Sequence, residues 1–549
     1  MIRPSTPTAW FASVLIFALA TSALGLNRPS DPVVATGSDL VALVGTSPSS
    51  IVGFRYEEGW TQIPIQVDER VVVDFGAVYD TTDTGHTFLT YADPGTYTGP
   101  DTDPLFDFDD ELVFMARDAG ERAQVGNEPA GVESGSGLEL TLFDPLMAES
   151  AWVYLFRSTT LPPGANQSLV DYQFDLLSGD YKSTYGIRAG PNPENSSVTT
   201  AAYAVHFADR WIRDETAVTL GGAAGDDLLD RHKSLFAPGV CGRSEDTFSA
   251  GEGAFIVNRS GPVRALRGYL GANSGPFTSR IHAFYEQRED ILTSLRVHAI
   301  SSVVDFFDYS AAAVGMSYFN DLNTGGVDVD GVPDAVVPGA VVWEMLTGDP
   351  GTLVMTHRFD TDIPAFDYTS YYEDDVSPPT TQCTGDASAY ASSGVFESDP
   401  IPNTDPYLGE HNTFELTRSI AFAAPNHDVA FARARAAEML QPLTLHASPW
   451  SPNPTDAATA WTPTRHLILR PNPARATTHI HFEQRIAGDF EVRCYDASGQ
   501  LVATPAIGSL PRGPHVLPWS LGELPAGVYW VRARGADRVW RTHRLVRLR

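Results

Sequence analysis

Short runs of alternating hydrophobic and polar residues, separated by turns rich in Gly and Pro, occupy most of the chain. A period of two is typical of strands with one buried face. Two hairpins are predicted most clearly, one pairing Ile51–Tyr56 with Trp60–Val67 and one pairing Leu138–Phe143 with Ala151–Phe156. The pattern therefore predicts an all-β protein whose body is a large β-sandwich.

Other segments continue this pattern, with one exception. Further strands are expected at Tyr203–Phe207, Ala254–Val257, Val263–Leu270, Ser279–Gln287, Leu292–Ile300, Ala340–Leu346, Leu353–Phe359 and Phe414–Phe422. The exception is Asp428–Leu440, whose Ala, Arg, Glu and Met content favours a helix, with Asn426 or Asp428 as its N-cap. No repeat of about 20–50 residues is present, which argues against a solenoid or a propeller.

The first 25 residues have the pattern of a secretory signal peptide. Arg3 precedes an apolar run, Trp10–Ala20, that is too short to span a bilayer, and Ala23-Leu24-Gly25 offers small residues for cleavage. We predict cleavage after Gly25. The mature protein is then secreted or displayed on the cell surface, with no transmembrane segment.

Composition divides the remainder into three parts. Residues 26–445 form an acidic β-rich body of one or two subdomains, and residues 446–464 form a linker rich in Pro, Ser and Thr. Residues 465–549 follow as a small sandwich of short strands.

Several short motifs occur in a fixed order in this last part. They are Pro471-Asn472-Pro473, Tyr495–Val502, Gly513-Pro514-His515 leading to Trp519, Leu524–Tyr529, and a basic final strand from Arg541 to Leu548. Together they resemble the C-terminal sorting domain of the type nine secretion family and its flagellar hook-cap-like immunoglobulin relatives. The resemblance implies an immunoglobulin-like sandwich without chemistry of its own, whose partner is the outer-membrane secretion machinery. The family usually has Lys in its final strands, where this chain has Arg.

The formal net charge is -31, but it is unevenly distributed. The last 85 residues carry 13 Arg and six acidic residues, so they are about +7 and the rest of the chain about -38. Such a body repels nucleic acid, and we expect no nucleic-acid partner. It suits Ca²⁺, which prefers carboxylate oxygens, although acidity also serves solubility alone.

The three cysteines are Cys241, Cys383 and Cys494. In an oxidising compartment Cys241 and Cys383 can form a disulfide, and the alternative is a pair of buried thiols. Cys494 lies in the middle of a predicted strand, where a small buried hydrophobic residue is expected.

The segment from Ser260 to Ile300 holds the candidate catalytic residues. Alternation places Arg280 and His282 on one face of a strand, and a turn near Glu289 would set them beside Arg296 and His298. The result would be a basic patch on an acidic protein. The alternative is a solvated strand face with weak cross-strand ion pairs.

The opening motif of this segment, Gly261-Pro262-Val263-Arg264, is followed by long paired strands. This resembles the supersandwich of galactose-mutarotase-like proteins and of several polysaccharide-lyase and glycoside-hydrolase accessory domains. The resemblance implies a supersandwich body and supplies no catalytic residue.

A β-eliminating polysaccharide lyase needs cations for a uronate carboxylate and a base for the C5 proton. The candidates by residue type are Arg264, Arg280 and Arg296 for substrate binding and His282, Tyr285 and His298 for catalysis. Three aromatic residues can stack on sugar rings if they are exposed, namely Trp211, Tyr371 and Tyr372. The alternative, which residue type favours, is that each is buried in the core.

Two acidic motifs are candidate Ca²⁺ sites. The first includes Asp107 and Asp109, and the second includes Asp328, Asp330 and Asp334 around Gly331. Neither is an EF-hand, since position twelve of the second motif lacks Glu and no helix flanks it. The alternative for each is an ordinary polar turn.

No motif of a serine hydrolase, zinc protease or nucleotide-binding protein is present. The sequence therefore favours a protein that binds carbohydrate, and it leaves open whether the protein also cleaves carbohydrate as a lyase or a glycoside hydrolase. The alternative is a structural or adhesive surface protein without catalytic activity.

Overall fold

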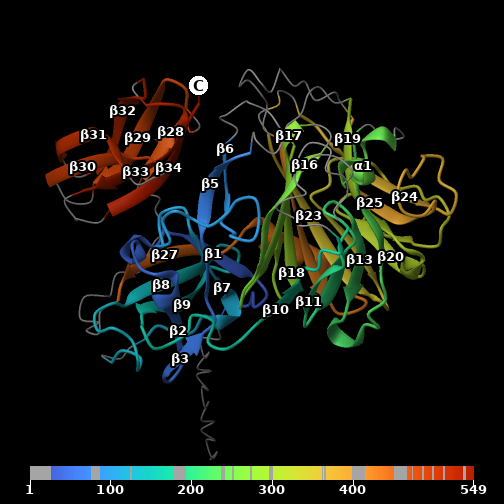
Figure 1. Ribbon diagram of the computed structural model, residues 1–549, viewed down its shortest axis with the longest axis horizontal. Helices are drawn as coiled ribbons and strands as arrows, with labels where there is room; N and C mark the ends of the chain where they lie inside the picture. The colour runs from blue at the N-terminus through green and yellow to red at the C-terminus, as the bar shows by residue number, and fades with distance from the viewer. Residues whose placement is uncertain are drawn as a thin grey trace, which may run out of the picture.

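The computed structural model shows three β-sandwiches arranged along the chain (Figure 1), so the all-β prediction is confirmed. The first is blue, the large central one runs from green to orange, and the last is red. The structure describes residues 26–548 apart from 76–86, 124–126, 179–192, 237–240, 250–252, 273–274, 296–300, 362, 364–365, 399–413, 451–466, 471, 473, 485–487, 497–499, 511–512, 523 and 536–539. Within these residues no helix is long and apolar enough to cross a membrane.

The first sandwich is built mainly from residues before 160. One sheet has the order β1 (Pro32–Thr36), β7 (Glu111–Met115), β4 (Gln66–Asp68). The other has the order β27 (Thr444–Pro449), β8 (Leu138–Asp144), β9 (Glu149–Arg157), β2 (Ile51–Tyr56), β3 (Trp60–Ile63). A separate ribbon pairs β5 (Arg70–Asp74) with β6 (Thr87–Tyr91). The two hairpins expected from the alternation are both present.

Strand β27 corrects the predicted boundary of the body. Residues 446–449, which we expected to belong to the linker, pair with β8 as an edge strand of the first sandwich. The next residue, Trp450, packs edge-on against Trp60 and Phe156, with ring centroids 5.9 and 5.8 Å away. The apolar contacts of Trp450 outweigh the turn tendency of the surrounding prolines, so the body extends to residue 450.

The central sandwich has one very wide sheet. Its nine strands have the order β15 (Ala254–Ser260), β16 (Ala265–Ala272), β17 (Gly275–Phe284), β18 (Arg288–Leu295), β26 (Phe414–Ala423), β23 (Gly351–Thr361), β22 (Trp343–Gly348), β20 (Ser317–Asn320), β21 (Val327–Asp328). A sheet of nine strands is near the upper end of the usual size.

Two four-stranded sheets cover the inner face of the wide sheet. One is β10 (Val170–Gln173), β11 (Ser196–Thr200), β12 (Tyr203–Phe207), β13 (Arg213–Val218), and the other is β14 (Leu229–Phe236), β19 (Val303–Tyr309), β25 (Ala389–Glu397), β24 (Thr369–Asp375). A common apolar core joins all three sheets, with Tyr203 stacked on Phe422 at 3.9 Å between ring centroids.

The two described α-helices are α1 (Glu245–Ser249) and α2 (Val429–Leu440), and α2 is the predicted one. The Asp428 carboxylate accepts a hydrogen bond from the Phe431 backbone N–H, which satisfies one of the free donors at the helix start. Ala432, Ala436 and Met439 of α2 pack on the outer face of the wide sheet.

Arg264 joins the first sandwich to the central one. Its guanidinium is 2% exposed and pairs with Asp68 at 2.8 Å and with Glu111 at 2.6 Å. It also donates to the Tyr285 hydroxyl at 3.2 Å. The structure therefore does not support the predicted substrate-binding role of Arg264, because its side chain is buried and all three contacts are internal.

The last sandwich has sheets in the orders β28 (Leu467–Arg470), β29 (Thr477–Gln484), β32 (Gly513–Ser520) and β31 (Leu501–Leu510), β30 (Gly488–Tyr495), β33 (Gly527–Arg534), β34 (Trp540–Arg547). Cys494 is fully buried in its core, as its place in a strand predicted. The Asn472 side chain donates to the Arg544 carbonyl and accepts from the Val546 N–H, so it fixes the final strand.

Cys241 and Cys383 form a disulfide across 142 residues of sequence. Of the two alternatives that the sequence left open, the structure therefore has the bonded one. The bridge ties the segment after β24 to the segment after β14.

Candidate functional site

The predicted basic patch lies inside the central sandwich rather than on its surface. Arg280, His282 and Tyr285 are 1%, 0% and 2% exposed. Arg296 and His298 lie outside the described residues. The alternation did place Arg280 and His282 on one strand face, but that face points between the sheets.

The strand register also differs from the prediction. The turn falls at residues 285–287, closed by a hydrogen bond from the Tyr285 N–H to the Arg288 carbonyl, and not near Glu289. Arg280 therefore lies opposite Thr293, and His282 lies opposite Ile291. Glu289 is instead a strand residue of β18, and its buried carboxylate contacts two interior side chains.

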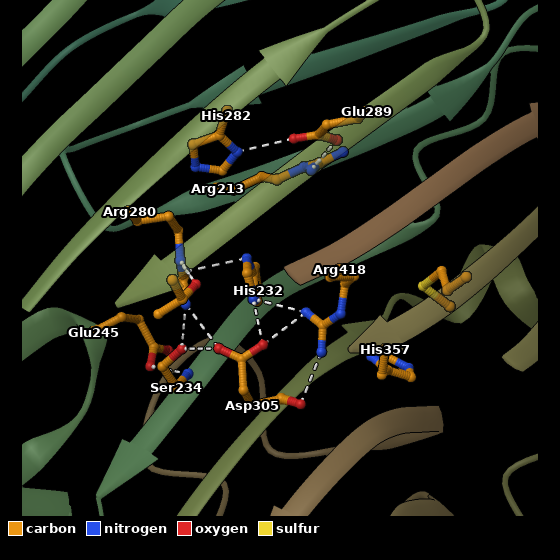
Figure 2. Close-up of polar contacts among 12 residues, drawn as sticks. Arg213, His232, Ser234, Glu245, Arg280, His282, Glu289, Asp305, His357 and Arg418 are labelled. Carbon is orange, nitrogen blue, oxygen red and sulfur yellow. Dashed lines mark hydrogen bonds and ion pairs between the residues drawn. The ribbon is translucent and has the colours of Figure 1, made fainter. Parts of the chain in front are cut away.

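Those side chains are His282 and Arg213. His282 Nδ1 lies 2.9 Å from one Glu289 oxygen, and the Arg213 guanidinium lies 2.7 Å from the other (Figure 2). Burial lowers the pKa of His282 to about 4, and the hydrogen bond to Glu289 only partly opposes this shift. His282 is therefore neutral at pH 7 and holds a fixed place between Glu289 and the Tyr269 hydroxyl.

Asp305 is the centre of a second buried network, also shown in Figure 2. Its carboxylate lies 2.7 Å from Arg280 and 2.8 Å from Arg418, both on the wide sheet. His232 and Ser234 contact it from β14, beside it on the opposite sheet. Burial alone would raise the pKa of Asp305. Its charged neighbours, led by Arg418, instead hold this pKa well below its usual range.

A narrow cavity adjoins Arg280 and Asp305. Its volume is about 10 Å³, which is room for about one water molecule. Most of its other lining residues are apolar, among them Trp211, Phe236 and Phe414. No sugar ring fits there, so the catalytic and uronate-binding roles predicted for His282, Tyr285 and Arg280 have no accessible site in this structure. These buried charges hold the two layers of the sandwich together.

The acidic motif at residues 328–334 is a turn and not a metal site. The Asp330 carboxylate accepts the Val332 N–H, and one Asp374 oxygen accepts the N–H groups of Asp330 and Gly331. Among the described residues, Asp328, Asp330 and Asp334 do not bring three ligand atoms together. The structure therefore does not support the Ca²⁺ site predicted here, because the three carboxylates do not converge and each accepts a hydrogen bond from a nearby group.

An open pocket of about 330 Å³ lies beside this turn, at the edge strand β24. Volumes of this order are typical of small-molecule sites. Because β24 is an edge strand, residues from both of its faces border the pocket. The lining residues are Pro333, Asp334, Tyr371, Tyr372, Glu373, Asp374, Asp375, Pro379 and Thr380.

Two tyrosines give the pocket its aromatic surface. Tyr371 packs on Phe306 and Tyr372 on Tyr318, each with ring centroids 4.5 Å apart, so both rings are held in place. The Tyr371 hydroxyl donates to Glu373 at 2.7 Å, and the Tyr372 hydroxyl donates to Asp334 at 3.1 Å. Both tyrosines are half-buried, whereas Trp211 is fully buried, which is the core position that the sequence offered as its alternative.

The pocket is acidic. Four of its lining residues are carboxylates and none is a Lys or an Arg. Burial and nearby Asp374 and Asp330 raise the pKa of Asp334, although the Tyr372 hydroxyl opposes this shift. An anionic ligand would be repelled here, whereas hydroxyl groups would find acceptors. The contiguous residues 371–375, two Tyr followed by three acids, are the sequence signal that marks this pocket.

The first acidic motif gives a different result from the second. Asp107 accepts the Asp109 N–H and its own N–H donates to Asp110, so the predicted ligands Asp107 and Asp109 shape a turn. The carboxylates that do converge are Glu69, Asp101 and Asp110. Glu69 lies 32 positions before Asp101, so the local pattern did not reveal it.

No family model and no curated protein matches this chain. Among solved structures, an alpha-mannosidase from Enterococcus faecalis V583 aligns with TM-score 0.37 and 8% identity over 90% of this chain and 54% of its own. A polysaccharide lyase aligns with TM-score 0.23 and 7% identity, over 64% and 47%. A putative aldose 1-epimerase from Escherichia coli K12 aligns with TM-score 0.22 and 12% identity, over 46% and 100%.

This chain therefore spans about half the length of the mannosidase. At these TM-scores and identities, no activity transfers from the three proteins to this chain. The absence of a matching family model also leaves the sorting-domain resemblance a prediction.

Proposed function

We propose that this protein is a carbohydrate-binding protein whose ligand is a neutral glycan, held in the pocket beside β24. The observation that supports this most is the placement of two fixed tyrosine rings next to carboxylates in an open space of about 330 Å³. Sugar rings pack their C–H faces on aromatic rings, and their hydroxyls donate to carboxylates.

The acidity of the pocket favours a neutral ligand over a uronate polymer. The arginines that could pair with uronate are inside the sandwich, where Arg264, Arg280 and Arg418 already have carboxylate partners. A uronate in the pocket would instead meet Glu373 and Asp375 without a neutralising cation among the lining residues. The lyase version of the carbohydrate hypothesis is thus the weaker one, and binding is the stronger.

The test is a binding screen of the purified protein against neutral and acidic polysaccharides and their oligosaccharides. We expect neutral glycans to bind. The variants Tyr371→Ala and Glu373→Gln should each weaken binding about tenfold, because each removes a stacking surface or a charged acceptor. Asp226→Asn, an exposed acid that does not line the pocket, should leave binding unchanged.

Binding that prefers uronate polymers, or binding unaffected by both pocket variants, would refute the proposal. If no glycan of the panel bound, the structural or adhesive alternative would replace it.

We also propose that the protein is exported, with residues 1–25 as the signal and residues 465–549 as the part that engages the outer-membrane secretion machinery. The Cys241–Cys383 disulfide supports an oxidising destination, since such bridges are rare in the cytosol. In a host that has this machinery, the full chain should reach the cell surface or the medium. A chain ending at residue 450 should remain in the periplasm, and its release at the wild-type level would contradict the proposal.

A further inference from the structure

Three carboxylates meet at the base of the first sandwich's ribbon. Glu69 lies between β4 and β5, and Asp101 and Asp110 come from the segment that leads into β7. One oxygen from each of the three lies within 4.8 Å of the other two. Two separate parts of the chain therefore bring their negative charges to one point.

Three of the carboxylate oxygens at this point are buried and have no N–H or hydroxyl donor. They are both oxygens of Glu69 and the Oδ2 atom of Asp101, each of which exposes less than 1 Å². Asp110 is 0% exposed, and it accepts the backbone N–H groups of Arg70 and Asp107. A buried carboxylate without a donor is costly, and a cation is one of the few groups that can compensate for it.

The nearest basic side chain is directed elsewhere. The Arg70 guanidinium pairs with Glu111 at 3.2 Å and with the Asp109 carbonyl, and not with Glu69 or Asp101. The three charges thus destabilise one another when no cation is present.

We propose that Glu69, Asp101 and Asp110 bind a Ca²⁺ ion. The ligands are all oxygens, which suits a hard cation and not Zn²⁺ or Cu²⁺. Ca²⁺–oxygen distances of about 2.3–2.6 Å accommodate ligand oxygens that lie within 4.8 Å of one another. Mg²⁺ keeps several of its waters and is rarely bound by protein carboxylates alone, so Ca²⁺ is the better fit.

The ion would fasten the first sandwich to the central one. The segment between β6 and β7 contacts the edge strand β15 of the wide sheet, where the Tyr97 N–H donates to the Phe255 carbonyl at 3.1 Å. Nearby, the Thr96 hydroxyl donates to the Ile256 carbonyl at 3.0 Å. Because Asp101 and Asp110 belong to this same segment, Ca²⁺ would hold it in the conformation that covers the edge.

The test is a Ca²⁺ titration of the purified full-length protein, stripped with a chelator and followed by calorimetry and by melting temperature. At about 5 mM Ca²⁺, above the dissociation constants typical of extracellular sites, we expect Tm to rise by at least about 2 °C. Glu69→Gln should abolish both the binding heat and the rise. Asp328→Asn, in the other acidic motif, should keep both.

The melting temperatures of the Ca²⁺-free wild type and variant give a second test, for which the direction of the difference is predicted. Without Ca²⁺, Glu69→Gln should melt at or above the wild-type temperature, because it removes a repelling charge. If Glu69 were only a structural residue, the same variant would melt lower. If Glu69→Gln fails to fold, Asp101→Asn is the variant to test in its place.

A wild-type protein with no heat and no Tm change in Ca²⁺ would overturn the inference, as would an equal response in Glu69→Gln or an equal effect of Mg²⁺. None of these results depends on glycan binding at the pocket beside β24.

Discussion

Replacing Asp305 by Asn is expected to lower the free energy of unfolding of the central sandwich by about 3–5 kcal/mol. The Asp305 carboxylate is the shared partner of Arg280, Arg418 and His232, all at most 2% exposed. An amide keeps the shape but removes the charge, so two guanidinium groups would remain buried without full compensation. Denaturant unfolding, followed by a probe in the central sandwich, measures the loss.

The matched control is Glu133→Gln, which removes one carboxylate from the Arg157–Glu133 ion pair. Both side chains of that pair are more than 40% exposed, at 43% and 46%. Its loss should therefore cost less than about 1 kcal/mol. A change of similar size in both variants would mean that the Asp305 network does not join the two layers as described.

The second large effect is acid destabilisation through His282. Its pKa is about 4 in the folded protein, because burial disfavours the imidazolium, and about 6.5 in the unfolded chain. The unfolded chain therefore binds the proton more readily between these values. The stability that neutral His282 contributes is complete above about pH 6.5 and is lost as the pH falls toward 4, by about 3 kcal/mol in total.

The variant His282→Phe isolates this contribution, since Phe cannot take up a proton. Carboxylates such as Asp308, whose pKa burial raises to about 6, change stability in the opposite direction, but they are common to both proteins. The stability difference between wild type and variant should shrink by about 2–3 kcal/mol from pH 7.5 to pH 4.5. A difference that stays constant with pH would show that His282 is not held neutral.

Local features of the fold were predictable because their causes are local. The Asp428 cap and the Ala-rich segment after it specified α2, and the Glu57–Gly59 turn specified the β2–β3 hairpin. The register of β17 with β18 was not predictable in the same way. It depends on Glu289 reaching His282 and Arg213, and Arg213 belongs to a strand more than 70 residues away.

The same distinction holds for the candidate sites. Tyr371 and Tyr372 were named as residues that can stack on sugars if exposed, but only the fold shows that their strand is an edge with an open pocket. For the metal site, the acidic motif was visible while its ligand Glu69 was not. Alternation showed that Arg280 and His282 share a face, and it could not show that a second sheet covers that face.

The most direct measurement of the proposed function is a crystal structure of the protein with the neutral oligosaccharide that binds it best. The account predicts a sugar ring against Tyr371 or Tyr372, with hydroxyls donating to Glu373 or Asp334. The account would be contradicted by a sugar bound elsewhere while this pocket stays unoccupied. The clearest contradiction would be a sugar bound in the interior beside Arg280 and Asp305.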